Sequence, residues 1–404
     1  MSRSRERRMR LFLVGTEFFR SYGGIQYVNR LLVRAFCHMG MRTPLELEVF
    51  SYIDGPEHFP AEMVGGQAVR WHGSERRRGE LAWWLTRRLA AVQPDLVLLT
   101  HVSLAPLAEL ANRLAPASRV ALLVHGTEVW QPLETRVARF LPRLDTFVSP
   151  SVFTARKLAE IHSIPSGKVT VIPHGLDPDW MADANEVPVP GNDAQDSSGP
   201  LLLSVTRLSR ADREGKGIDL VLQALPSVLV RCPGVRYRVV GGGGDLPRLA
   251  ETVRKMGLSG RVELSGARRD EVLKQSYTDA AAFVLPTQVE GFGIVFLEAM
   301  YNRLPVVAVR ASATPEVIEH GVTGLLAAPG NVEELADALV AVLSDPGRRR
   351  AMGEAGRRRV ERLYSFDQFV ALWERWLVSQ VPEVLYAARQ TSAFVRARAA
   401  LGAA

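Results

Sequence analysis

Cysteine and long apolar runs are what this sequence has least of. Only two cysteines, Cys37 and Cys232, occur in 404 residues, which excludes a disulfide framework and favours the reducing cytoplasm. No apolar run approaches the roughly 20 residues that a membrane-spanning helix needs. The basic start MSRSRERRMR is followed by LFLVG, which is too short for the apolar core of a signal peptide. The sequence therefore predicts a cytoplasmic protein that is soluble or lies peripherally on the inner face of the membrane.

Nucleic-acid-binding motifs are also absent. The chain has no Cys/His finger spacing, no RNA-binding aromatic signature and no basic heptad region. Its formal net charge of +7 suits an anionic membrane or a polyanionic small substrate, but ordinary solvated arginines produce the same sign. The pair Trp83 and Trp84, flanked by arginines, also has two possible interpretations. It either docks on an anionic membrane or belongs to a core helix with both rings packed inward.

What the chain does contain is a series of apolar, β-rich runs, each followed by a polar loop and a helical pattern. The predicted strands fall within 9–15, 94–103, 120–128, 146–151 and 168–177, and then within 201–209, 236–244, 262–267, 281–287 and 304–310. Strands that alternate with helices in this way predict parallel sheets with crossover helices, which is the α/β class.

A segment rich in Pro, Gly, Asp and Ser divides the two series of strands. Residues 186–199, EVPVPGNDAQDSSG, are typical of a flexible linker. We therefore predict a Rossmann-like N-terminal domain over 1–185 and a second Rossmann-like domain over 200–362. The tail, 363–404, is predicted to be helical and to pack back on the body, since its apolar residues recur at three and four. Those residues are Phe366, Phe369, Val370, Trp373 and Leu377.

Polar residues and glycines follow several of the predicted strands. In chain order they are Gly23 and Gly24, His101, His125, Arg207, Gly241 to Gly244, and Glu290. Ligands of open parallel sheets bind beyond the carboxyl ends of the strands. In two facing domains, these residues are therefore predicted to line one interdomain cleft.

The stretch VEGFGIVFLEAM, residues 289–300, carries two carboxylates eight positions apart. If a helix begins near Gly293, its first amides have no partner within the helix and suit a phosphate. Gly291 and Gly293 let the backbone approach that phosphate. Eight residues span about 12 Å along a helix, which matches the separation of ribose and hexose in a nucleotide sugar. Glu298 is then predicted to hold the ribose and Glu290 the transferred sugar.

Two cations precede this stretch in the segment RLSRADREGKGIDL. A diphosphate leaving group needs positive charge as its bond to the sugar breaks, and a fixed arginine and lysine can supply it in place of a metal. Arg207 and Lys216 are the candidates. We predict no metal and no cofactor other than the nucleotide-diphosphate sugar, which is a co-substrate.

With these pieces in place, the chain resembles the retaining glycosyltransferases of family 4, which have the GT-B architecture. The matching segments fall in order over about residues 9–345: GGIQ, VHGTE, SVFTARKL, VIPHGLD, SVTRLS with GKGID, VVGGGGD and EGFGIVFLEA. The resemblance implies an N-terminal acceptor domain and a C-terminal donor domain. It implies GDP-mannose, or UDP-glucose as the close alternative, as donor, and a glycan or lipid-linked acceptor.

The resemblance also implies individual roles. His125 lies near the anomeric carbon, Gly24 against the diphosphate, Arg207 and Lys216 on the diphosphate, and Glu290 and Glu298 at the two ends of the donor. The remaining donor-binding positions implied are Gly23, Gly241, Gly242, Gly266, Ala267, Gly291, Phe292, Gly293, Ile294 and Val295.

Three departures from the family pattern stand out. The insertion RADRE lengthens the Arg-to-Lys spacing, His174 replaces the usual asparagine, and VVGGGGD carries two extra glycines. A histidine at a strand end is often simply bonded to backbone, so His101 and His174 are read either that way or as direct participants. Asp177 and Asp179 resemble a metal-binding pair, but turn formation explains them as well.

Two other functions fit parts of the sequence. Two Rossmann-like units suit a dinucleotide-dependent oxidoreductase, although no Gly-x-Gly-x-x-Gly follows the first strand. A non-catalytic sugar-binding or nucleotide-binding module is the third alternative.

For the transferase, no enzyme nucleophile is evident near His125, so we expect front-face attack in which a leaving phosphate oxygen takes the proton of the acceptor hydroxyl.

Overall fold

Two parallel sheets organise the chain in the computed structural model, which describes residues 8–60, 69–183, 199–209, 215–268 and 270–382. The chain divides into two compact units, one made of 1–175 and 366–404 and the other of 176–365. The predicted linker 186–199 lies almost entirely outside the described residues, as do the insertion at 210–214 and the last segment of the tail.

The first unit is built on a sheet of seven parallel strands in the order β3-β2-β1-β4-β5-β6-β7. Its strands are β1 (Met9–Gly15), β2 (Leu45–Ser51), β3 (Arg70–Gly73), β4 (Leu96–Leu99), β5 (Arg119–Leu123), β6 (Thr146–Ser149) and β7 (Val169–Val171). Its helices are α1 (Gly24–Gly40), α2 (Arg78–Val92), α3 (Leu107–Leu114), α4 (Thr135–Ala138), α5 (Val152–His162) and α15 (Phe366–Gln380).

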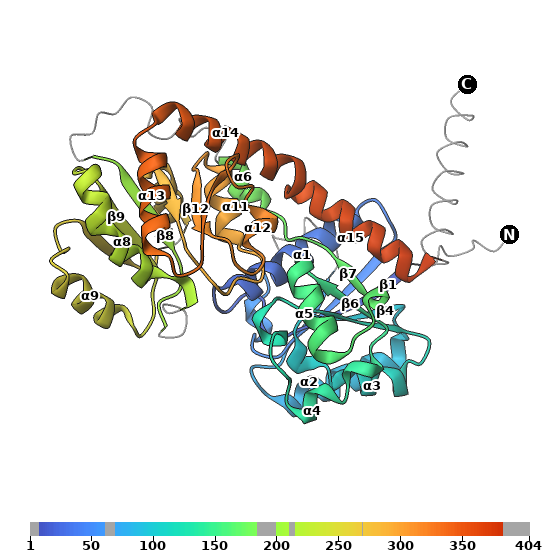
Figure 1. Ribbon diagram of the computed structural model, residues 1–404. Helices are drawn as coiled ribbons and strands as arrows, with labels where there is room; N and C mark the ends of the chain where they lie inside the picture. The colour runs from blue at the N-terminus through green and yellow to red at the C-terminus, as the bar shows by residue number, and fades with distance from the viewer. Residues whose placement is uncertain (1–7, 61–68, 184–198, 210–214, 269, 383–404) are drawn as a thin grey trace, which may run out of the picture. The chain divides into compact units, whose positions relative to one another are not determined.

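The second unit has six parallel strands in the order β10-β9-β8-β11-β12-β13, shown with the first in Figure 1. The strands are β8 (Leu201–Val205), β9 (Arg236–Val240), β10 (Val262–Gly266), β11 (Ala282–Val284), β12 (Val306–Val309) and β13 (Gly324–Ala327). The helices are α6 (Pro178–Asp183), α8 (Ile218–Arg231), α9 (Leu246–Lys255), α10 (Asp270–Asp279), α11 (Ile294–Tyr301), α12 (Thr314–Val317), α13 (Val332–Leu343) and α14 (Pro346–Leu363).

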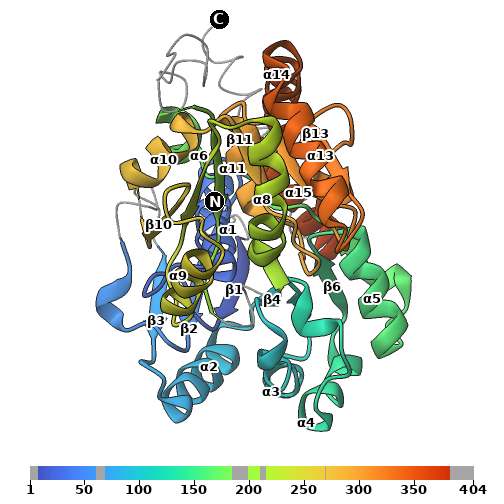
Figure 2. The same cartoon turned by 60° about the vertical axis from the view of Figure 1, so that its left-hand side comes forward.

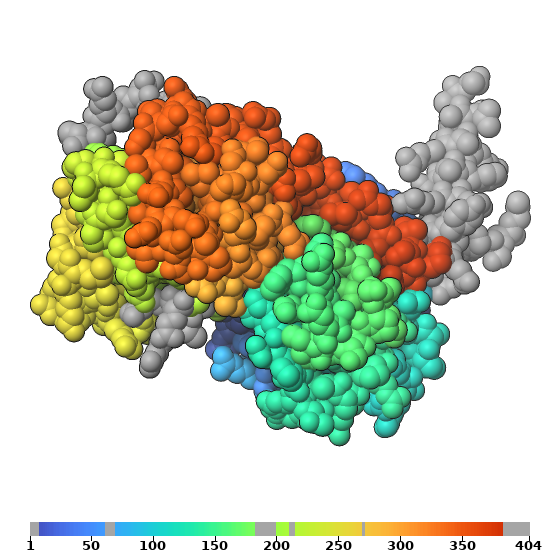
Figure 3. Space-filling view, in the orientation of Figure 1, coloured from blue at the N-terminus to red at the C-terminus, as the bar shows by residue number. Residues whose placement is uncertain are grey.

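Both units have the doubly wound α/β arrangement expected from the sequence. In each, the first strand lies in the middle and the chain reverses its direction of progress across the sheet once, beside that strand. The helices cover the apolar faces of the second sheet in pairs. Figure 2 shows α8 and α13 side by side, and in Figure 3 the side chains of α13 and α14 cover much of the face of this unit turned to the viewer.

The tail helix α15 packs as its apolar spacing predicts. Phe369, Val370, Trp373 and Leu377 are buried, and the Trp373 ring meets the Phe36 ring of α1 edge to face with 5.7 Å between centroids. The last helix therefore completes the first unit, although the whole second unit separates it from that unit in the sequence.

Candidate active site

Residues predicted for donor binding gather at one edge of the second sheet. The chain reverses direction between β8 and β11, which are neighbours in the sheet. In doubly wound sheets, the loops that leave two such strands diverge, and ligands bind beyond the carboxyl edge at this point. Arg207 follows β8, and Glu290 follows β11. The sequence therefore carries both predicted groups to the point where this fold binds ligands.

Backbone contacts tie the Lys216 segment to the loop that leads to Glu290. The Gly215 carbonyl accepts hydrogen bonds from the Gln288 amide (3.1 Å) and the Thr287 hydroxyl (3.2 Å). Gly217 caps α8 with φ 74°, and a Cβ there would lie 2.4 Å from the carbonyl oxygen of Pro286. Only glycine fits that position, so its neighbour Lys216 is held beside the β11 loop.

Lys216 and Glu290 form an ion pair. Lys216 Nζ lies 2.6 Å from Glu290 Oε2, and the two side chains are only 23% and 13% exposed. The Ser312 hydroxyl accepts from the Glu290 amide at 3.0 Å, which fixes the backbone of the acid. Because the pair is largely shielded from water, its charges interact more strongly than a surface pair would. The structure thus brings together two residues that lie 74 positions apart.

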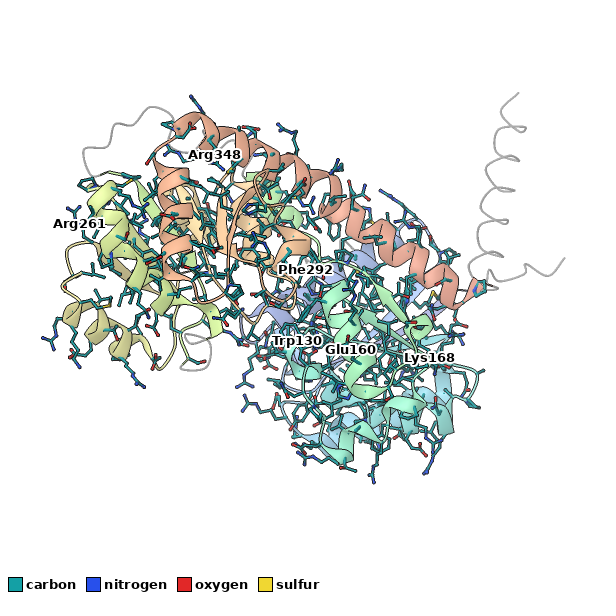
Figure 4. All side chains as sticks on the ribbon, viewed as in Figure 1. Trp130, Glu160, Lys168, Arg261, Phe292 and Arg348 are labelled. Carbon is teal, nitrogen blue, oxygen red and sulfur yellow. The ribbon has the colours of Figure 1, made fainter. Side chains whose placement is uncertain are left out.

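Helix α11 begins where the sequence predicts. Gly293 caps it with φ 94°, a left-handed conformation that favours glycine, and a Cβ there would lie 2.4 Å from the Phe296 ring. Ile294 and Val295 are its first residues, so their amides have no partner within the helix. Gly291 and Phe292 are buried just before it, and the Phe292 ring, labelled in Figure 4, contacts Tyr364 edge-on.

Glu298 lies in the second turn of α11 and is half-buried. Its Oε2 accepts a hydrogen bond of 2.6 Å from the Tyr277 hydroxyl of α10. Burial raises the pKa of Glu298 to about 7, and the Tyr277 hydrogen bond only partly opposes this. Tyr277 was not among the residues predicted from the sequence, because nothing in its spacing shows that α10 meets α11.

Two of the four glycines after β9, Gly241 and Gly243, are explained by packing on the Arg207 loop. A Cβ at Gly241 would lie 1.7 Å from the Thr206 carbonyl oxygen, and one at Gly243 would lie 2.3 Å from Leu208 backbone. The Leu208 amide donates to the Gly242 carbonyl at 2.9 Å, and the Gly241 amide donates to the Gly266 carbonyl at 2.9 Å. These contacts fix the backbone conformation of the loop that carries the exposed residue Arg207.

Ala267 continues the same set of contacts. Its Cβ lies 3.0 Å from the place a Cβ would take at Gly242. The loops after β8, β9 and β10 are therefore packed on one another, and Gly241, Gly242, Gly266 and Ala267 lie side by side as backbone surface.

Gly241→Ala is expected to destabilise the protein by more than about 2 kcal/mol, since the methyl group forces the Arg207 loop and the glycine loop apart. The KM for the donor is expected to rise as well. Gly244→Ala is the matched control, because nothing lies within 4 Å of a Cβ at that glycine. Thermal melting and donor titration of both variants check this, and equal melting temperatures would contradict it.

Three histidines of the first unit gather at the carboxyl edge of its sheet. His101 follows β4, His125 follows β5, and His174 follows β7. The centroid of the His125 ring is 6.4 Å from that of His101 and 6.2 Å from that of His174. The sequence analysis placed His101 and His125 among the strand-end residues and gave only His125 a role at the donor. The structure brings His101 and His174 beside His125.

The hydrogen bonds of His125 determine which ring nitrogen carries the proton. Nε2 lies 2.7 Å from the carbonyl oxygen of Thr100, which can only accept, so Nε2 carries the hydrogen and Nδ1 is left as an acceptor. The His125 amide donates to the Glu128 carboxylate. Burial, with a smaller contribution from His125, lowers the pKa of His174 well below its usual value, so this ring is neutral.

The first helix of this unit begins at the predicted glycines. Gly23 caps α1 in an extended conformation and Gly24 is its first residue. Nothing lies within 4 Å of a Cβ built on Gly24. The backbone at Gly24 is therefore open to a ligand.

Local geometry bears on two alternatives that the sequence leaves open. The Asp179 amide donates to Asp177 Oδ1 at 2.9 Å, so this pair caps the turn into α6. Across the described ranges, no three residues of the His, Cys, Asp and Glu types are placed to hold a metal ion together.

The two tryptophans of α2 differ in their burial. Trp84 packs inward against the His72 ring, with 4.9 Å between centroids, whereas Trp83 is 52% exposed.

Comparisons with known proteins agree with this geometry. The model of "Glycosyltransferase Family 4" matches residues 22–180, and that of "Glycosyl transferases group 1" matches residues 192–359. A GDP-mannose-dependent alpha-(1-6)-phosphatidylinositol monomannoside mannosyltransferase of Mycobacterium tuberculosis is 31% identical over 388 residues, which cover 90% of this chain and 96% of that protein. The chain belongs to glycosyltransferase family 4.

Solved structures similar to this family 4 glycosyltransferase show the same GT-B fold. A glycosyltransferase from Rickettsia africae has a TM-score of 0.75 at 18% identity, covering 93% of this chain and 99% of its own. Anabaena Alr3699/HepE in complex with UDP-glucose has a TM-score of 0.72 at 18% identity, covering 92% and 100%.

Family membership decides between the functions that the sequence left open. The family 4 glycosyltransferase is an enzyme, a hexosyltransferase that takes its sugar from a nucleotide sugar, and not a dinucleotide-dependent oxidoreductase or a non-catalytic module. None of its described helices has the length and apolar character needed to cross a bilayer.

Proposed function

We propose that this glycosyltransferase moves mannose from GDP-mannose to a hydroxyl of a lipid-linked or polysaccharide acceptor, with retention at the anomeric carbon. The M. tuberculosis relative, which matches along 90% of the chain, is a GDP-mannose-dependent phosphatidylinositol monomannoside mannosyltransferase by name, and this supports both the donor and the lipid acceptor. UDP-glucose is the second candidate donor, because the structurally similar HepE of Anabaena is described in complex with it.

The observation that carries the proposal is the Lys216–Glu290 ion pair at the carboxyl edge of the second sheet. A diphosphate draws Lys216 away from the acid, and the freed carboxylate then accepts hydrogen bonds from the sugar hydroxyls. Arg207 and the first amides of α11 add positive potential on the same diphosphate, which replaces a metal ion in stabilising the leaving group. Glu298 holds the ribose.

In the proposed reaction, His125 accepts a hydrogen bond from a hydroxyl of the donor sugar. Its Nδ1 is available because the Thr100 carbonyl holds the hydrogen on Nε2. The nearby Glu128 carboxylate is bound by the His125 amide, so it serves the loop and not as a nucleophile. The acceptor hydroxyl then attacks on the face that the leaving group departs from, and its proton passes to a phosphate oxygen of that group.

A peripheral position on the inner face of an anionic membrane fits a lipid-linked acceptor. Trp83 is 52% exposed on α2, and the Arg87 guanidinium lies over its ring at 5.5 Å. An exposed indole beside arginines suits the headgroup region of such a surface.

A panel of nucleotide sugars tests the donor. GDP-mannose is expected to raise the melting temperature more than UDP-glucose or GDP-glucose, by mass action on the folded state. Turnover of GDP-mannose with a chelator present, followed by NMR of the anomeric proton of the product, tests retention and metal independence together. Protection by UDP-glucose alone would move the assignment to the second donor, and an inverted product would overturn the mechanism.

A further inference from the structure

Tyr277 is a buried phenol held in one orientation by neighbours from three elements. Its side chain is fully buried. The Phe283 ring of β11 lies nearly parallel to it at 5.9 Å and 15°, and the Trp180 ring of α6 meets it edge-on at 5.4 Å and 89°. Ring packing on two sides leaves the phenol little freedom to rotate.

The hydroxyl of this ring is aimed at Glu298, with 2.6 Å between the oxygen atoms. Burial raises the pKa of Tyr277 well above its usual value, and the Glu298 charge adds to the effect. The proton therefore stays on the tyrosine, which donates to Glu298 Oε2. One carboxylate oxygen is fixed in this way, and Oε1 is the oxygen left to accept from a ligand.

We propose that Tyr277 is a positioning residue for donor binding, which orients Glu298 so that its second oxygen accepts hydrogen bonds from the ribose hydroxyls of the nucleotide. The inference rests on the proposed assignment of Glu298 to the ribose. A single carboxylate serves a vicinal diol only when its rotation about the side-chain bonds is restricted. Tyr277 supplies that restriction from α10, which carries none of the residues assigned to the donor from the sequence.

Tyr277→Phe removes the hydroxyl and keeps the ring between Phe283 and Trp180. The dissociation constant of GDP is expected to rise roughly tenfold, the size of effect expected for one lost hydrogen bond to a charged group. The dideoxy analogue of GDP, which lacks both ribose hydroxyls, is expected to bind the variant and the wild type equally. In turnover, KM for the donor is expected to rise with kcat nearly unchanged, since the ribose contact is made equally in ground and transition states.

Tyr237→Phe is the matched control. Tyr237 is also fully buried in the second unit, and its hydroxyl is bonded to the Ser204 hydroxyl at 2.8 Å instead of to Glu298. Tyr237→Phe is expected to lower the stability of the protein without changing the ratio between the dissociation constants of GDP and its dideoxy analogue. A role of Tyr277 in packing alone would weaken GDP and its dideoxy analogue to the same extent, and that result would overturn the proposal.

Glu298→Gln separates this proposal from the one on which it rests. If Glu298 holds the ribose, the glutamine variant also loses the preference for GDP over the dideoxy analogue. Should Glu298→Gln keep that preference, the ribose assignment itself fails. If Glu298→Gln loses the preference and Tyr277→Phe keeps it in full, the ribose assignment stands and the positioning role of Tyr277 is wrong. If the donor panel selects uridine, UDP and its dideoxy analogue take the place of the guanosine pair.

Discussion

Glu290→Gln is expected to reduce kcat about 10²–10³-fold, as loss of one charged group that stabilises a transition state does in other enzymes. The amide keeps the shape and the hydrogen-bonding oxygen of the carboxylate, but it removes the negative charge that accepts most strongly from the sugar hydroxyls as the bond to the diphosphate breaks. Steady-state transfer assays at saturating donor measure the effect.

The fold of the Glu290→Gln variant should remain intact. The Glu290 side chain is 13% exposed and, among the residues that the structure describes, bonds only to Lys216. Its replacement therefore leaves one ammonium group that can turn to water. Glu354→Gln is the control, because it removes another carboxylate from an ion pair of this unit, that with Arg303 at 2.8 Å, away from the proposed site. Turnover of Glu290→Gln within twofold of the wild type would refute the role given to this acid.

Glu298→Gln is expected to stabilise the protein at high pH while it weakens donor binding. In the folded protein the pKa of Glu298 is raised from 4.5 to about 7. Between pH 4.5 and pH 7, the folded state therefore keeps a proton on Glu298 that the unfolded state has lost. Its favourable contribution is complete below about pH 4.5 and is lost as the pH rises through 7. Each pKa unit corresponds to about 1.4 kcal/mol, so most of this loss, about 2–3 kcal/mol, falls between pH 5 and pH 8.

The glutamine variant is neutral at every pH and does not suffer that loss. Its melting temperature relative to wild type is therefore expected to rise clearly from pH 5 to pH 8. Glu354→Gln, whose acid on α14 is 42% exposed and pairs with Arg303 beyond α11, should show no such trend. A constant difference between Glu298→Gln and wild type across this range would show that the carboxyl is ionised in the folded protein throughout.

Most strands of the described structure were predicted from the sequence, but β2, β3 and β13 were not identified. The prediction of β1 over 9–15 and of a helix beginning at Gly293 agrees with the structure. β2 was not identified, because Glu46 and Glu48 interrupt its apolar residues. Glu48 is nevertheless buried, since Arg88 and His72 bind its carboxylate at 2.6 Å and 2.7 Å. That compensation comes from residues distant in sequence, so no local pattern shows it.

The same distinction applies to the site. Lys216 and Glu290 both follow strands that become neighbours in a doubly wound sheet, so their meeting could be expected from topology. Tyr277 meets Glu298 only because two helices pack at a particular angle, and His101 and His174 join His125 only because three strand ends converge. Gly241 and Gly242 were predicted as donor-binding positions, whereas packing on the Arg207 loop already requires glycine at 241 and 243.

The Lys216–Glu290 contact has a consequence for how the enzyme discriminates among anions. With no ligand present the ammonium and the carboxylate neutralise each other, so the resting protein attracts free phosphate weakly at this point. In the proposed binding mode, a bare nucleotide diphosphate pairs with Lys216 but leaves the Glu290 carboxylate without a hydrogen-bond donor, close to the negative charge of the diphosphate. A nucleotide sugar satisfies both halves at once, because its hydroxyls replace the ammonium as donors to the acid. On this proposal, the Lys216–Glu290 contact alone favours the intact nucleotide sugar over its nucleotide diphosphate product.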